Sequence, residues 1–336
     1  MKLVLYPLIL LILAPIFLIG IGFFLLPILR SRGEVSGTTY EPFSARLIYH
    51  LFGSRLDPLA LQLAKGLPAT SPIVMWLMFR PMIWASEMSG YIPDILNYPP
   101  PQGPLSINAM MAARCEFLDQ AIAESVQQGD QIVILGAGWD TRAYALLKSG
   151  LNKHNKLSIF EVDAPATQAV KRSALGKSGI DDSHVVFVSC DFNQQSWLDA
   201  LVENGFDTTL RTFILWEGVT YYLKEQAIQS TLRAVATLPK GSSIAFDFFS
   251  RQWMDSFTGK MARSSINITY GEAMIFGFPI GSDFSESLNF YLEDNGLRLK
   301  QHRCLYNKDK PAYGGIALAE NPQAKDSQAL QGSTSS

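Results

Sequence analysis

The sequence predicts an α/β protein with a mostly parallel sheet covered by helices on both faces, preceded by an apolar N-terminal helix. Three observations lead to this prediction. Short runs rich in Val, Ile and Phe alternate with helical segments over residues 106–320, which is the pattern of a buried parallel sheet. A Gly-Ala-Gly turn follows the first run. Open α/β sheets commonly have such a glycine turn after their first strand, at the start of a nucleotide-type site. The 27 residues from Leu3 to Leu29 carry no charge.

The first element is the apolar stretch from Leu3 to Leu29. As a helix it would span roughly 40 Å, more than the ~30 Å hydrocarbon core of a bilayer. Its three prolines are better tolerated in lipid than in an isolated soluble helix. The alternative is a cleaved secretory signal, but the apolar run is long for one and the following Val-Ser-Gly is a poor cleavage site. We therefore predict that residues 1–32 form an uncleaved transmembrane anchor.

The flanking charges predict the orientation of this anchor. Arg30, Arg32 and Arg46 outweigh Lys2, so the C-terminal side should be cytoplasmic in a single-pass membrane protein. Three scattered cysteines form neither a disulfide framework nor a zinc motif, which fits a reducing compartment; they are Cys115, Cys190 and Cys304. The net charge of −2 argues against a nucleic-acid partner.

Residues 33–105 are expected to form an accessory segment between the anchor and the main domain. Residues 71–85 are strongly apolar around Arg80, yet too short for a confident second span. They could be core, a lid over a hydrophobic site, or a membrane-contacting surface. A proline-rich connector at 97–104 marks the boundary to the main domain. Residues 321–336, rich in Ser and Gln, are predicted to be a disordered tail.

Within residues 106–320 the elements alternate regularly. Helices are predicted at 106–128, 140–151, 164–175, 196–204, 224–238 and 286–295. Strands are predicted at 131–136, 157–163, 185–189, 212–217, 242–249, 297–305 and 312–318. Residues 251–283 break the alternation and are predicted to be an insertion.

Acidic residues stand at the carboxyl ends of the second, third and fourth strands, where open α/β sheets bind ligands. A single acid there is more often a helix cap, but several after a glycine turn indicate a cofactor site. Glu161 or Asp163 can accept hydrogen bonds from ribose hydroxyls. The candidate residues after the strands are Gly136, Gly138, Asp163, Asp191, Phe192 and Glu217.

These motifs resemble the leucine carboxyl methyltransferase family, whose members are S-adenosylmethionine-dependent O-methyltransferases of the Rossmann-like class I fold. The resemblance rests on AARCEFLD, LGAGWDTRAY, FEVDAP with a downstream Lys171, SCDF and WEGVTYYL. It spans roughly residues 106–249 and continues more weakly to about 319. The N-terminal helix and much of residues 34–104 lie outside it.

The resemblance implies a set of residues that bind S-adenosylmethionine. They are Arg114 for the methionine carboxylate, Gly136 and Gly138 for the methionine moiety, Asp163 for the ribose, Asp191 and Phe192 for the adenine, and Glu217 for the amino group. Cys115 and Trp139 depart from the residues usual in the family, but neither change removes a cofactor contact.

Methyl transfer is an in-line displacement, so the protein mainly aligns the acceptor and excludes water. A carboxylate acceptor needs no general base, whereas a hydroxyl usually does. No histidine is expected at the site: His154 and His184 precede strands, His302 lies within one, and His50 has no predicted place. We therefore predict a carboxylate or acidic hydroxyl acceptor, on a small molecule, lipid or peptide, with no catalytic base and no metal assigned. Tyr221, Tyr222 and Tyr270 are expected to be packing residues.

Two other functions remain open on the sequence. A nicotinamide-dependent oxidoreductase is disfavoured because the turn lacks the third glycine of GxGxxG and no Tyr-x-x-x-Lys pair is present. A non-catalytic membrane protein that binds an adenosyl ligand is the second, since a fold alone never proves turnover.

Overall fold

The protein, seen in a computed structural model that describes residues 2–103, 105–126, 131–148, 157–192, 194–306 and 311–322, contains the predicted α/β sheet. The strands are β1 (Gln131–Leu135), β2 (Ser158–Asp163), β3 (Val185–Ser189), β4 (Thr212–Trp216), β5 (Ser243–Phe249), β6 (Arg298–Leu305) and β7 (Gly314–Glu320). They form one seven-stranded sheet in the order β3-β2-β1-β4-β5-β7-β6. β7 runs antiparallel to both of its neighbours, β5 and β6. This is the Rossmann-like methyltransferase sheet that was predicted.

The burial of each strand follows its sequence. β1 (QIVIL) and β4 (TFILW) are buried at every residue, as expected for central strands with helices on both faces. β6 (RLKQHRCL) is largely exposed along its length and carries three cationic side chains. Charged side chains on an edge strand discourage pairing with another chain, so the sheet ends here.

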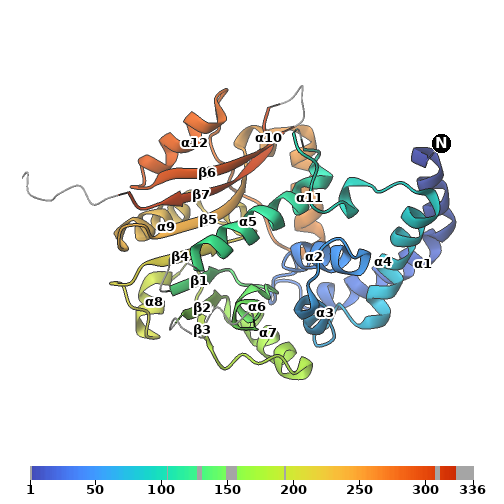
Figure 1. Cartoon of the computed structure of the whole chain (residues 1–336), viewed down its shortest axis with the longest axis horizontal. Helices are drawn as coiled ribbons and strands as arrows, with labels where there is room; N and C mark the ends of the chain where they lie inside the picture. The colour runs from blue at the N-terminus through green and yellow to red at the C-terminus, as the bar shows by residue number, and fades with distance from the viewer. Residues whose placement is uncertain are drawn as a thin grey trace, which may run out of the picture.

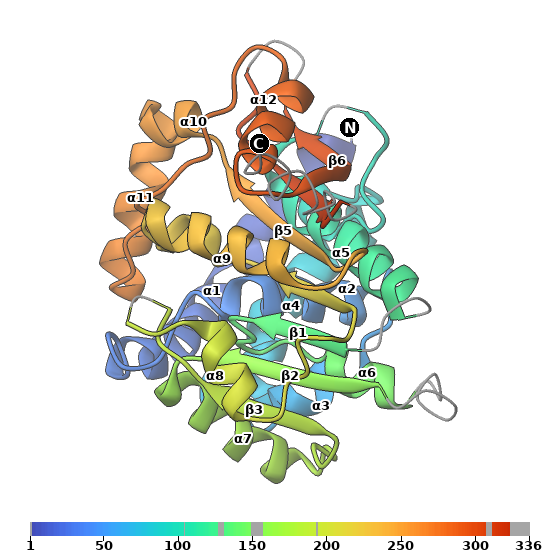
Figure 2. The same cartoon turned by 90° about the vertical axis from the view of Figure 1, so that its left-hand side faces the viewer.

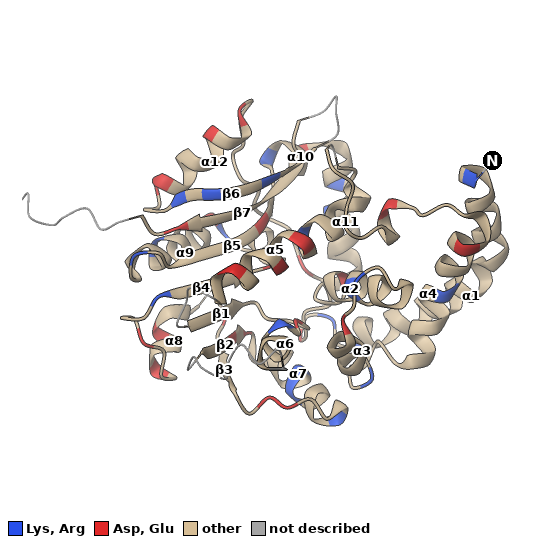
Figure 3. Cartoon of the chain, viewed as in Figure 1, with Lys and Arg blue, Asp and Glu red and all other residues tan. Residues whose placement is uncertain are grey.

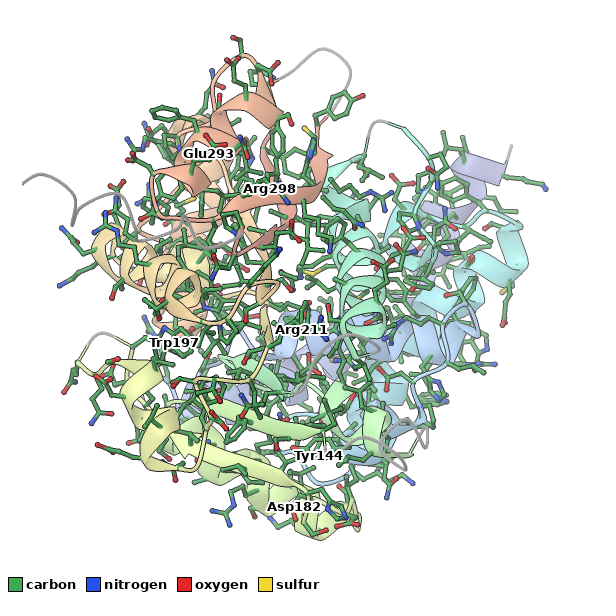
Figure 4. All side chains as sticks on the ribbon, turned by 60° about the vertical axis from the view of Figure 1, so that its left-hand side comes forward. Tyr144, Asp182, Trp197, Arg211, Glu293 and Arg298 are labelled. Atoms are coloured by element: carbon green, nitrogen blue, oxygen red, sulfur yellow. The ribbon has the colours of Figure 1, made fainter. Side chains whose placement is uncertain are left out.

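Helices cover both faces of the sheet (Figure 2). They are α5 (Met110–Val126), α6 (Arg142–Lys148) and α7 (Pro165–Ser178) on one face, and α8 (Trp197–Glu203), α9 (Glu225–Thr237) and α12 (Phe284–Glu293) on the other. Along β1 the side chains alternate, with Ile132 in one core cluster and Val133 in the other. Tyr144 belongs to the first cluster and Trp197 to the second (both labelled in Figure 4).

The N-terminal third of the chain forms a helical unit at one end of the sheet (Figure 1). Its elements are α1 (Lys2–Arg30), α2 (Tyr40–Phe52), α3 (Pro58–Ala64), α4 (Pro72–Ser89), η1 (Asp94–Leu96) and η2 (Ile107–Ala109). The predicted insertion contains α10 (Arg251–Asp255) and α11 (Phe257–Tyr270). The short 3₁₀ turn η4 (Thr220–Tyr222) lies between β4 and α9. The predicted tail from residue 323 onwards, the end of the predicted helix 140–151 and His154 lie outside the described residues.

α1 packs along α4, and the two helices run antiparallel. Tyr6 near the start of α1 contacts Tyr91 after α4, with ring centroids 5.7 Å apart. Gly20 lies against the middle of α4, where an added Cβ would come within 2.8 Å of the Leu77 backbone. The antiparallel contact places the start of α1 beside the end of α4, at the far end of the molecule in Figure 1.

The two ends of α1 have different surroundings. Near its C-terminal end Ile28 is 2% exposed, and the ring of Phe24 meets that of Tyr40 in an edge contact at 5.6 Å. Nearer the N-terminus Leu11 and Ile12 are 72% and 77% exposed, and α1 is almost free of charge (Figure 3). The helix is long and apolar enough to cross a bilayer, which suits either an anchor or a signal sequence.

The contact at Gly20 can be tested with a matched pair of substitutions. Gly20→Val should loosen the α1–α4 contact by about 1–3 kcal/mol, because overpacking forces the backbones apart. Gly22→Val is the control, since an added Cβ there meets nothing within 4 Å. Thermal unfolding of the full chain in detergent should show a lower melting temperature for Gly20→Val alone. Equal melting temperatures for the two variants would show that close helix approach at Gly20 is unimportant.

Candidate active site

A cavity of about 290 Å³ lies at the carboxyl ends of β1 to β4. The residues that follow these four strands form its floor, and residues of α2 and the loop before it form its roof. All seven predicted cofactor residues line this cavity, namely Arg114, Gly136, Gly138, Asp163, Asp191, Phe192 and Glu217. Parallel strands bring their carboxyl ends to one edge of the sheet, so residues up to a hundred positions apart meet here.

Two glycines shape the floor of the cavity after β1. Gly136 has φ +65° and Gly138 has φ +39°, a region that residues with a Cβ rarely adopt. A Cβ on Gly136 would come within 2.4 Å of Val219 Cγ2, and one on Gly138 within 2.9 Å of Thr39 Cγ2. Both positions therefore require glycine, for conformation and for space.

Asp163 is held at the end of β2 by the glycine turn. Its Oδ2 accepts a hydrogen bond from Gly138 N at 2.5 Å, and its Oδ1 accepts one from Ala164 N at 2.7 Å. Burial raises the pKa of Asp163, and these two N–H groups counteract part of the shift. Glu161 is absent from the cavity wall and instead pairs with Lys171 at 2.7 Å. Of the two carboxylates considered for the ribose, only Asp163 reaches the site.

Arg114 of α5 lines the cavity and is 1% exposed. Its Nε lies 2.9 Å from Glu217 Oε1, and its Nη1 lies 2.9 Å from Asp247 Oδ2. Its Nη2 is buried and has no hydrogen-bond partner among the described residues. A buried guanidinium nitrogen without an acceptor is costly, so a ligand carboxylate in the cavity would satisfy it.

Glu217 is clamped between two arginines. Oε1 faces Arg114, and Oε2 accepts from Arg142 Nη1 at 2.5 Å. Burial by itself would raise the pKa of Glu217, but Arg142 and Arg114 bring it below its ordinary value. The carboxylate is therefore charged, as binding of an amino group would require.

The clamp belongs to a larger buried network of ion pairs that the sequence did not predict. It ties α2, α3, α5 and the β1 turn together through these pairs: Arg46–Asp57 at 2.7 Å, Arg46–Asp140 at 3.5 Å, Arg55–Asp57 at 2.8 Å, Arg55–Asp119 at 2.6 Å, Arg142–Asp119 at 2.7 Å and Arg142–Asp140. A usable signal was the pair of arginines, Arg46 and Arg55, inside an otherwise apolar segment.

The roof of the cavity is tied down by Glu272, which follows α11. One oxygen of Glu272 accepts from Gly37 N at 2.7 Å, and the other accepts from Thr38 Oγ1 at 2.7 Å. Glu41 lines the cavity from the first turn of α2. No sequence motif marks either acid, so both were missed.

Three roles were considered for residues 71–85, which the structure places in α4 and its N-cap. α4 buries Met75 and Phe79 in the core, while Ile73 remains 73% exposed. No residue of α4 lines this cavity, whose roof is formed by residues 36–43. α4 lines a separate apolar pocket through Met75, Trp76 and Ile83, so a role as a lid over a hydrophobic site stays a prediction. The buried side of α4 is core, and its exposed side remains open to a membrane or another surface.

The order and direction of the seven strands are those of the Rossmann-like methyltransferase sheet. Residues 89–236 match the family model described as leucine carboxyl methyltransferase. The resemblance inferred from the motifs is thus confirmed.

Individual proteins are similar to the chain over part of its length. A Bacillus subtilis protein provisionally named S-adenosyl-L-methionine-dependent methyltransferase YktD is 31% identical over 56% of this chain. That match spans only 61% of the relative's own length. A Mycobacterium marinum protein with the same provisional description is 26% identical over 68% of this chain and 74% of its own. Among solved structures, an O-methyltransferase family protein from Burkholderia thailandensis has a TM-score of 0.42 at 11% identity, covering 65% of this chain and 59% of that one.

The ion-pair network predicts acid destabilisation. Burial opposes ionisation of Asp140, yet Arg142 and Arg46 lower its pKa to about 2, and arginines likewise lower the pKa of Asp57, Asp119 and Glu217. Groups with a lowered folded pKa contribute stability above their unfolded pKa of about 4 and lose it as the pH falls through the folded value. Carboxyls with a raised folded pKa, such as Asp163, change the stability only above about pH 4. Below that pH they are protonated in both the folded and the unfolded state, so they do not alter the expected profile.

We therefore expect the free energy of unfolding to fall steadily between about pH 4 and about pH 2, by up to ~1.4 kcal/mol for each unit by which a carboxyl pKa is lowered, and the melting temperature to fall with it. Circular dichroism melts across this range would measure it. Asp140→Asn should flatten the profile, whereas Asp199→Asn, an exposed residue of α8, should not. A melting temperature that is constant below pH 4 would contradict the stabilising role of the network.

Proposed function

We propose that this protein is an S-adenosylmethionine-dependent O-methyltransferase that methylates a carboxylate or hydroxyl acceptor at the cytoplasmic face of a membrane. The observation that carries the proposal is the gathering of the seven predicted cofactor residues around one cavity. The unpartnered Nη2 of Arg114 in the wall of that cavity supports it.

Each wall of the cavity has groups suited to one part of the cofactor. Arg114 Nη2 would hold the methionine carboxylate, and Glu217 the amino group, beside the glycine turn. Asp163 would accept from the ribose hydroxyls, while Asp191 and Phe192 would meet the adenine. When bound, the cofactor supplies an electrophilic methyl group on a sulfonium.

The rest of the cavity would align the acceptor and keep water away. The roof residues from Ser36 to Phe43 close the side opposite the sheet, and Glu272 holds their backbone in place. Alignment and exclusion of water account for much of the catalysis in group transfers of this kind.

Membrane attachment is supported by α1. Its most apolar 18 residues have a mean hydropathy of 3.0, and only 17% of them are buried within the protein. Arg30 is the last residue of α1, and Arg32 is exposed just beyond the helix. Arg46 is buried in the ion-pair network, so in the folded protein it does not count among the exposed positive charges that flank the helix. The two remaining arginines still favour a cytoplasmic body.

Cofactor binding is the direct test. Calorimetry on the full chain in detergent should show binding of S-adenosylmethionine and its demethylated product, and none of NADH. Asp163→Asn should weaken binding by about 1–3 kcal/mol, the range for a hydrogen bond to a charged group. Asp181→Asn, in an exposed loop, is the matched control. Binding of NADH in place of the adenosyl ligand would establish the oxidoreductase alternative.

Membrane attachment can be tested by deleting most of α1, including Tyr6 and Ile9, which pack in a small separate cluster with Ala85 of α4. Deleting residues 1–19 removes the exposed part of α1 and keeps Phe24 and Ile28, which cover the core. The shortened protein should move from the membrane pellet to the soluble fraction after cell lysis. Retention in the pellet would assign the attachment to another surface, with the exposed side of α4 as the first candidate.

A further inference from the structure

The cavity has no cation available for an anionic acceptor. Its described wall contains two cationic side chains, Arg46 and Arg114. Arg46 is paired with Asp57 and Asp140. Arg114 is paired with Glu217 and Asp247, and its remaining nitrogen is the one assigned above to the cofactor carboxylate.

Acidic groups dominate the same wall. Six carboxyl side chains line the cavity: Glu41, Asp140, Asp163, Asp191, Glu217 and Glu272. A carboxylate acceptor would add another negative charge to this set without a partner, and like charges at short range are unfavourable. The electrostatics therefore favour a neutral acceptor over an anionic one.

Glu41 differs from the other five acids in its partners. Asp140 and Glu217 pair with arginines, and Asp163 and Glu272 accept from backbone N–H groups. Asp191 accepts from the side chain of Gln194. Glu41 forms no ion pair among the described residues, and its hydrogen-bond partner is the hydroxyl of Tyr270. Its carboxylate can therefore accept a further proton.

Glu41 lies at the methionine end of the cavity. Its charge acts on Arg114, Tyr221 and Tyr222, and Arg114 is the residue assigned to the methionine carboxylate. It lines the cavity beside the other roof residues Thr38 and Thr39. Phe43, two residues further along the first turn of α2, also lines the cavity and makes this side partly apolar.

We propose that the methyl acceptor is a neutral hydroxyl compound and that Glu41 is the general base that removes its proton. This inference rests on the proposed methyltransferase function. As the acceptor oxygen forms its bond to the methyl carbon, the bond from that carbon to the sulfonium sulfur breaks. The hydroxyl proton passes to Glu41 and then to solvent, and the products are a methyl ether and the neutral thioether.

The surroundings of Glu41 suit this role. Burial raises its pKa, while Arg114 and Tyr270 lower it and Glu272 raises it. A carboxylate with a raised pKa is a stronger base, and catalytic bases work best with a pKa near the working pH. Tyr221 and Tyr222 of η4 complete the titratable groups facing it.

The chemical class of the methylated group can be determined without identifying the acceptor compound. Full-length protein in detergent is incubated with S-adenosylmethionine carrying a labelled methyl group and an extract of lipids and metabolites from cells that produce it. Separate portions of the labelled product are then treated with mild alkali or with hydriodic acid. Mild alkali releases methanol from methyl esters, and hydriodic acid releases iodomethane from methyl ethers. We expect a label that is stable to alkali and released by hydriodic acid.

Glu41→Gln tests the base. General bases contribute roughly 10²–10⁴-fold, so we expect labelling to fall at least ~100-fold, with unchanged affinity for the demethylated cofactor by calorimetry. Glu203→Gln, exposed on α8, is the matched control and should label normally. The unchanged affinity shows that the variant site is folded.

The outcomes separate the two proposals. Release of the label by alkali, or full labelling by Glu41→Gln, overturns the hydroxyl inference and leaves the methyltransferase function standing. Label that resists both treatments points to a nitrogen acceptor and also overturns it. No labelling by the unmodified protein, despite cofactor binding, defeats the proposed function and the inference together.

Discussion

The buried ion-pair network around Arg46, Arg142 and Arg114 is the interaction on which the rest of the structure depends. It joins α2 and the start of α3 to the β1 turn, to the end of β4 and, through Arg114, to β5. Removing charges from water is costly, and removing one member of a buried pair typically costs about 3–5 kcal/mol. The network forms only when the N-terminal helices and the sheet are assembled, so it couples α2 and the start of α3 to the sheet.

The same network shapes the candidate site. Because Glu217 lies between Arg114 and Arg142, its carboxylate stays charged in the wall of the cavity. The wall as a whole carries more acids than bases. This imbalance suits a cofactor with a positive sulfonium and amino group, and it disfavours an acceptor that carries a negative charge.

The N-terminal helix connects the cavity to the proposed membrane surface. Phe24 and Ile28 at one end of α1 belong to the main core cluster, and the loop that follows becomes the roof of the cavity. Thr39 of that loop contacts the glycine turn, while Ser36 donates from its backbone to Thr167 of α7. The apolar helix and the roof of the cavity therefore belong to one continuous stretch of about forty residues, and the buried C-terminal end of α1 is the end nearer to the roof.

The sequence by itself determined the sheet, its helices and the floor of the site. Period and composition located every strand to within two residues, because strands buried on both faces read as continuous apolar runs. Gly136, Gly138 and the acids after the strands could be recognised because parallel strands carry their ends to one edge. Only the tertiary structure decided the roof, the ion-pair network and the packing of α1 on α4. Glu41 meets Tyr270, and Arg46 meets Asp140, across distances in the chain that no local pattern records. Such contacts arise from packing of separate elements, and a side chain's charge partner becomes visible only when those elements are in place.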